Sequence, residues 1–248
     1  MIAAVIRTAL AGVLTLGLAP VVQAAGPFTP PAGCEGYMTV QLKSCSVGNY
    51  FRCASDAPGD QWSTYFDDHG PLFTSRIDAE TRWMQSYDHV IDEWDALNEK
   101  AADHASFTTL LETGRDDFDF TTTSEHGETR RYMGWDRLTG EILRIDGIAL
   151  ERTEFDVTAY DADGAPLWHR TGRQFIHREW RIFLADTETF ESVEGEVIEV
   201  ADTPIDFAFP GEPGFMTTRP DYGCDMMMTK AGPAQARTIQ TIAFQGRP

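Results

Sequence analysis

The sequence predicts a mainly β protein: one antiparallel meander of about 8–10 strands, forming a curved or barrel-like sheet, with one or two helices at about residues 88–113 that cover one face or one end. Three observations lead to this expectation. Apolar and polar side chains alternate at every second position along most of the chain, turn residues recur at short intervals, and only the region from 88 to 114 departs from this rhythm.

The N-terminus has the features of a secretory signal. A single basic residue, Arg7, precedes a short apolar run, and small residues follow up to Ala24. The run is too short to cross a bilayer, and no other segment approaches about 20 apolar residues. We therefore expect cleavage after Ala24, an extended lead-in over residues 25–33, a single β-rich domain over residues 34–248, and a location in the periplasm or outside the cell.

The stretch from Pro71 to Trp83 shows the alternation most clearly. Phe73, Ile77 and Trp83 share one parity, and the other parity carries four charges: Arg76, Asp78, Glu80 and Arg82. On a strand these charges line one face, so we expect a single strand with a solvated outer face. The alternative is that the charged face forms the wall of a polar ligand cavity.

Further strands are expected at regular intervals. Residues 130–135 and 141–150 read as a hairpin joined across 136–140, and residues 153–160 turn at Asp161–Gly164 into the strands over 166–172 and 173–185. Three more candidates follow at 194–200, 204–209 and 236–244.

The region from 88 to 114, which departs from the alternating pattern, suggests helices. Val90, Ile91, Trp94 and Leu97 have helical spacing, which predicts a first helix. A second, shorter helix is predicted to begin after Asp103 or Ser106, to place Leu110 and Leu111 inward, and to end at Gly114.

Four cysteines, an even number in an exported chain, indicate two disulfides: Cys34, Cys45, Cys53 and Cys224. Three pairings are possible. A turn at Gly48-Asn49 would favour Cys45 with Cys53, which leaves Cys34 to reach Cys224. No C-x-x-C pair is present, so we expect these cysteines not to bind a metal.

The net charge of −19 disfavours binding to nucleic acid and to anionic lipid surfaces. The chain has no G-x-S-x-G elbow, and oxidised cysteines offer no thiolate. His169 and His177 could share a strand face, and Met226–Met228 could offer thioethers to copper, but core or surface roles are commoner. We therefore expect no metal and no cofactor.

Acidic side chains form several pairs that could serve acid catalysis if a cleft brought them together: Asp67 with Asp68; Asp116, Asp117 and Asp119; and Glu125 with Glu128. The favoured hypothesis is nevertheless an exported, non-enzymatic protein that binds a small or lipophilic ligand on a concave sheet. The alternatives are a hydrolase with a carboxylate pair on a β scaffold, and a structural or partner-binding protein of the cell envelope.

Overall fold

A computed structural model describes residues 26–224, and all of its strands belong to one antiparallel sheet. The mainly β prediction is confirmed, with thirteen strands instead of the expected 8–10. The strands are β1 (Cys34–Leu42), β2 (Ser46–Cys53), β3 (Gln61–Phe66), β4 (Pro71–Ile77), β5 (Trp83–Asp88), β6 (Glu93–Leu97), β7 (Arg115–Ser124), β8 (Thr129–Ile145), β9 (Ile148–Tyr160), β10 (Pro166–His177), β11 (Ile182–Ser192), β12 (Val197–Ala201) and β13 (Pro204–Ala208).

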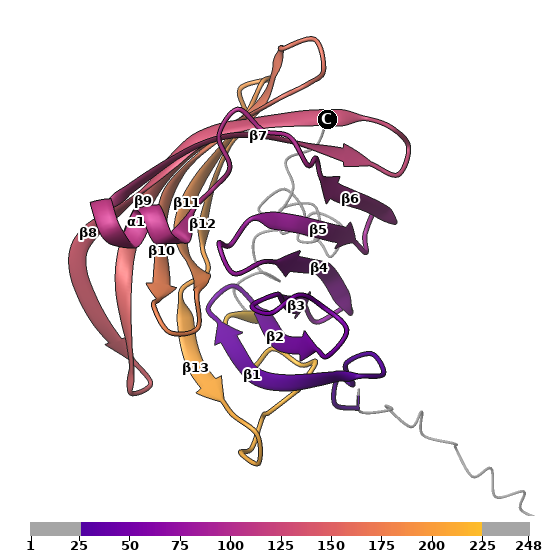
Figure 1. The fold of residues 1–248 in the computed structure, drawn as a ribbon. Coiled ribbons are helices and arrows are strands. Elements are labelled where there is room, and N and C mark those ends of the chain that lie inside the picture. The colour runs from indigo at the N-terminus through magenta and orange to yellow at the C-terminus, as the bar shows by residue number, and fades with distance from the viewer. Residues whose placement is uncertain (1–25, 225–248) are drawn as a thin grey trace, which may run out of the picture.

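The sheet curls strongly without closing. The long strands β7 to β11 arch over one side of the molecule, and the short strands β1 to β6 form the other side (Figure 1). The edge strands are β12, which pairs with β11, and β13, which pairs with β1. Only Asp202 and Thr203 separate these two strands, so one stretch of chain reaches from one edge of the sheet to the other.

Both faces of β10 are buried. Trp168 packs with Phe120, Tyr132 and Phe190, whereas Phe175 packs with the apolar side chains of β1, β9 and β11. Because Trp168 and Phe175 are an odd number of residues apart on one strand, they point to opposite faces. Curvature thus lets one sheet supply two apolar clusters.

Two glycines permit this curvature. A Cβ atom on Gly134 would lie 2.2 Å from the carbonyl oxygen of Asp156, and one on Gly172 would lie 2.2 Å from that of Thr187. Backbone atoms of the neighbouring strand cannot move away as a side chain can. These positions therefore require glycine because strands approach too closely for any side chain.

The only helix among the described residues is α1 (Phe107–Thr113). The side chain of Ser106 caps its N-terminus by accepting a hydrogen bond from the Thr109 amide, and Gly114 ends it with a left-handed φ of 83°. Phe107 and Leu110 bury against Ile176. The second predicted helix is therefore confirmed.

The first predicted helix is wrong. Asp88 ends β5, and its carboxylate accepts hydrogen bonds from the amides of Val90 and Ile91, which stabilises a turn. Trp94 then lies in β6, opposite Tyr87 and stacked on its ring. The spacing that suggested a helical stripe comes from a tight turn followed by a short strand.

Three expected strand boundaries also differ. The strands expected at 166–172 and 173–185 divide elsewhere, because β10 continues to His177 and the chain turns, with the Arg181 amide donating to the His177 carbonyl, before β11 begins at Ile182. The strand predicted from Pro71 to Trp83 breaks after Ile77, because Asp78 accepts hydrogen bonds from the amides of Glu80 and Arg82 and forms a turn. The hairpin loop predicted at 136–140 is an irregularity inside the continuous strand β8. The real turn lies at Asp146-Gly147, where both residues have positive φ, and this pair is a strong hairpin signal.

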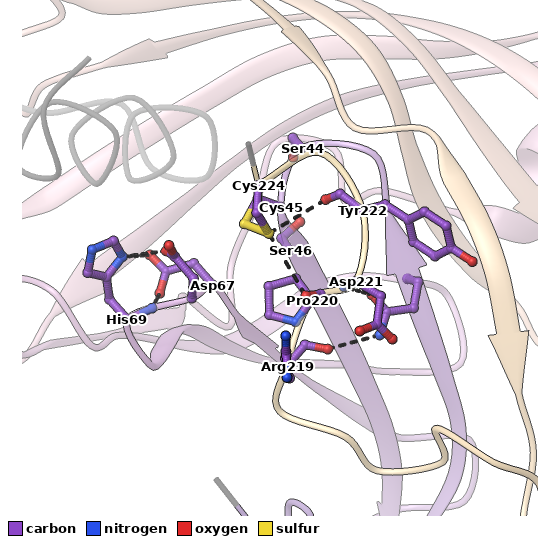
Figure 2. The surroundings of a disulfide bond; sticks show 12 residues. Ser44, Cys45, Ser46, Asp67, His69, Arg219, Pro220, Asp221, Tyr222 and Cys224 are labelled. Atoms are coloured by element: carbon purple, nitrogen blue, oxygen red, sulfur yellow. Dashed lines mark hydrogen bonds and ion pairs between the residues drawn. A yellow bond between two sulfur atoms is a disulfide. The ribbon is translucent and has the colours of Figure 1, made fainter. Parts of the chain in front are cut away.

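Two disulfides are present, but the favoured pairing is wrong: Cys34 bonds Cys53, and Cys45 bonds Cys224. Gly48 and Asn49 lie inside β2 and form no turn. The hairpin turns instead at Cys45, which has a φ of 58°, so Cys34 and Cys53 face each other at the open end of the hairpin. Figure 2 shows Cys45 at the other end, bonded to Cys224.

Within residues 26–224 no helix is long and apolar enough to cross a membrane. The predicted signal and its cleavage site, the methionines at 226–228 and the strand expected at 236–244 lie outside the described residues.

Candidate functional site

A cavity of about 260 Å³ lies between the two sides of the curled sheet. Strands β2 to β5 line one wall, and β10 to β12 line the other. The volume is close to the lower end of the range for small-ligand pockets. The site therefore arises from strands that are far apart in the sequence and that the curvature of the sheet brings face to face.

Much of the lining is apolar or aromatic: Tyr50, Tyr65, Phe73, Ile77, Trp83, Ile182 and Leu184. Trp83 is 44% exposed, an unusual state for the largest apolar side chain, and its ring makes edge contacts with Phe120 and Tyr132. This tryptophan extends the apolar surface of the cavity toward the cluster around Trp168.

The cavity is thus faced by the apolar side chains of this stretch, Phe73, Ile77 and Trp83. The four charged residues between positions 76 and 82 do not form its wall. Arg76 lies on the other face of β4, 3.4 Å from Asp60 and over the ring of Trp62. The other three charges hold turns together. Asp78 binds Arg82, and Glu80 accepts hydrogen bonds from residues at the start of α1.

Two tyrosines keep one region of the cavity uncharged. The hydroxyl groups of Tyr50 and Tyr65 are 2.6 Å apart. Burial raises the pKa of Tyr65 to about 12 and raises the pKa of Tyr50 well above its usual value of 10.0. Both phenols therefore stay protonated under physiological conditions and add polar but neutral contacts to the aromatic wall.

The opposite wall carries a nearly buried ion pair. Arg170 Nη2 lies 2.5 Å from Glu188 Oε1, and the guanidinium lies over the ring of Trp168. Arg170 Nε is buried and donates no hydrogen bond among the described residues. This nitrogen is therefore a buried polar group without a partner beside the cavity, which is uncommon in folded proteins.

Two more acids border the cavity, and each has partners. Asp186 lies 3.1 Å from Arg152 Nε and accepts a hydrogen bond from Thr203 Oγ1 at 2.8 Å. Asp202 accepts hydrogen bonds from the hydroxyls of Ser44 and Ser46. Burial raises the pKa of Asp202, and the charge of Glu188 raises it further. In the described part of the chain, neither histidine nor cysteine lines the cavity.

The carboxylate pairs singled out from the sequence lie elsewhere. Asp117 and Asp119 point outward to Arg115 and Arg131, each at 2.6 Å, whereas Asp116 is buried on the other face of β7. Glu125 and Glu128 engage the amide of Trp94 and the guanidinium of Arg130. None of these acids is among the described residues that line the cavity.

Asp116 has a partner that the sequence did not reveal. Across the β7–β8 ladder it faces Asp136, and its carboxylate accepts a hydrogen bond from the amide of Ser106 at 2.8 Å. Burial raises the pKa of Asp116 to about 6 and that of Asp136 to about 7. The charge of Asp116 raises the pKa of Asp136 further, whereas the charges of Asp103, Asp117 and Glu80 raise that of Asp116. This pair lies beside α1, away from the cavity lining.

His169 and His177 do not converge. His169 Nε2 lies 3.1 Å from Asp156, whereas His177 stacks on Trp180 near the end of β10. Asp67, Asp68 and His69 do come together, in the turn between β3 and β4.

The sequence reasoning missed Arg170, Glu188 and Asp202. One signal for Arg170 was present, since it shares the parity of Trp168 and thus places a charge on an apolar face.

No protein-family model matches the chain, and comparisons with curated proteins and with solved structures also found no match.

Proposed function

We propose that the protein binds a small lipophilic ligand in the cavity between β2–β5 and β10–β12. The observation that carries this proposal is the apolar lining, which includes a half-exposed tryptophan. Apolar surface gathered in a concavity, together with polar groups that orient the ligand, is the usual composition of a small-molecule site.

The polar groups of the site fit binding better than catalysis. Each acid at the cavity already has partners: Glu188 has Arg170, Asp186 has Arg152, and Asp202 has two serine hydroxyls. Uncharged polar side chains also line the cavity, among them Gln61, Ser63 and Gln85. The ligand would therefore be mainly apolar and would carry a few polar groups that can form hydrogen bonds with these side chains.

We further propose that the protein acts after export, in the periplasm or outside the cell. Two disulfides support this proposal, because such bonds persist in oxidising compartments. The N-terminal signal pattern supports it independently.

The binding proposal is tested with a neutral lipophilic dye, N-phenyl-1-naphthylamine, whose fluorescence rises in apolar surroundings. We expect saturable binding to one site per chain. Trp83→Ala should weaken the dye affinity about threefold to tenfold, because an aromatic contact contributes about 0.5–1.5 kcal/mol beyond area burial. Trp135→Ala is the matched control, since Trp135 packs between Arg115 and Arg137 and does not line the cavity.

Native mass spectrometry of protein from its own cells would show whether a small molecule co-purifies. If the dye binds without saturation, or if both tryptophan variants lose affinity equally, the cavity is not the binding site.

The second candidate is hydrolysis, favoured by the raised pKa of Asp202 next to Glu188. Turnover of ester or glycoside substrates that Asp202→Asn abolishes, without loss of dye binding, would replace the binding proposal with this one.

A further inference from the structure

The turn between β3 and β4 gathers three groups that can bind a metal. One carboxylate oxygen each from Asp67 and Asp68 and one imidazole nitrogen of His69 all lie within 4.8 Å of one another. His69 Nδ1 is 2.5 Å from Asp68 Oδ1 and 3.5 Å from Asp67 Oδ2. Three consecutive residues thus direct their side chains toward one point.

The backbone of the turn holds Asp67 in place. Its Oδ1 accepts hydrogen bonds from the amides of His69, at 2.6 Å, and Gly70, at 2.9 Å. Its own amide donates to the Gly70 carbonyl at 3.0 Å. These contacts use one carboxylate oxygen and fix the direction of the other.

That other oxygen, Asp67 Oδ2, is buried and accepts no hydrogen bond from any described residue. The Asp67 side chain is only 2% exposed, so this oxygen is shielded from bulk solvent. A buried carboxylate oxygen without a partner is costly, and a cation beside it removes most of that cost.

The His69 ring is the nearest cationic group that could lie beside this oxygen, but its Nδ1 atom is closer to Asp68 than to Asp67. The imidazole would use its short contact with Asp68, and Asp67 Oδ2 would keep only an ion pair at 3.5 Å. A metal ion between the three groups would instead contact all of them, because carboxylate oxygens and imidazole nitrogen are common ligands of zinc and similar ions.

We propose that Asp67, Asp68 and His69 bind a divalent transition-metal ion, with zinc as the representative of this class. Asp68 and His69 are partly exposed, with 45% and 34% of their side chains accessible, so water would complete the coordination. In the described residues no cysteine is free, hence no thiolate competes for the ion.

The site is distinct from the cavity, since none of its three ligands lines that cavity. It lies beside the Cys45–Cys224 disulfide (Figure 2). Metal binding there would brace the turn between β3 and β4 near the residues that precede Cys224.

The test is calorimetric titration of the untagged protein with zinc chloride, supported by the visible spectrum of bound Co²⁺. We expect one zinc ion per chain and a Co²⁺ spectrum typical of nitrogen and oxygen ligands. Asp67→Asn keeps Oδ1 for the backbone contacts and removes the charged ligand oxygen, and His69→Ala removes the nitrogen. Each should weaken zinc binding about tenfold or more.

His126→Ala is the matched control. His126 also lies in a tight turn beside acids, Glu125 and Glu128, but it joins no metal-binding group among the described residues. Zinc affinity that is equal in all three variants and in the unaltered protein would show adventitious binding to the acidic surface and would overturn the proposal. So would the absence of a saturable site.

Discussion

The two disulfides should stabilise the protein by different amounts because they close chain loops of very different length. The residues of the Cys34–Cys53 bond are 19 apart in the sequence, and those of Cys45–Cys224 are 179 apart. The perturbation is replacement of each pair in turn with alanine. Alanine leaves no unpaired thiol and buries no new polar group, which matters at the 3% exposed Cys45.

The expected magnitudes follow from the entropy that each loop removes from the unfolded chain. The loop-closure relation gives about 3 kcal/mol for the short loop and about 5 kcal/mol for the long one, a difference of about 2 kcal/mol. The folded state should change little when the long-range bond is absent. Gln41 still binds the backbone of Arg219 and Asp221, and Asn49 still binds the carbonyl of Thr217.

The assay is equilibrium unfolding in guanidinium chloride, followed by tryptophan fluorescence and circular dichroism without reductant. The Cys45→Ala/Cys224→Ala variant should be less stable than Cys34→Ala/Cys53→Ala by about 2 kcal/mol. Equal losses of unfolding free energy in the two variants, or a larger loss in the short-loop variant, would refute the reasoning. The entropy of the unfolded chain would then not explain the difference in stability.

Three further predictions concern the acids and the helix cap. Because burial and Asp116 raise the pKa of Asp136 from 3.8 to about 7, the folded state holds a proton that the unfolded chain releases, and stability should fall as pH rises between these values. Melting curves should show that Asp136→Asn removes much of this fall and changes little at pH 4; an unchanged pH profile would contradict the assignment. Asp78→Ala should cost about 1–3 kcal/mol in urea unfolding, since it leaves two turn amides without their acceptor, and a neutral effect would exclude that role. Ser106→Ala should cost about 1 kcal/mol in the same assay through loss of the cap on α1, whereas Glu112→Ala, at an exposed position of the same helix, should change stability little.

The fold class was predictable because alternation is a local property. The strand expected at residues 153–160 lies within β9, where Phe155, Val157 and Ala159 are buried and the residues between them are partly exposed. The cap at Ser106 and the stop at Gly114 were equally local, and both predictions are confirmed. One error arose where a turn used ordinary residues. The turn after Asp88 depends on side-chain acceptors that the periodic pattern does not register.

The candidate sites were less predictable because they depend on contacts between distant strands. Tyr50 and Arg170 lie on opposite walls of one cavity. The sequence around Tyr50 does not mark it as a cavity residue, and the only local signal for Arg170 is that a charge occupies a position whose neighbours on the same strand face are apolar. Asp136 faces Asp116 only through the register of β7 with β8. Asp67, Asp68 and His69 are adjacent in the chain, but only the turn makes their side chains converge.

By itself, the sequence determined the period-two alternation, the short capped helix and the even number of cysteines, since each depends on residues close together in the chain. The tertiary structure alone decided which cysteines pair, which strands form the two walls of the cavity and which acids lose contact with water. The physical reason is that strand register and sheet curvature, which set these distances, result from the packing of the whole sheet and not from any one strand.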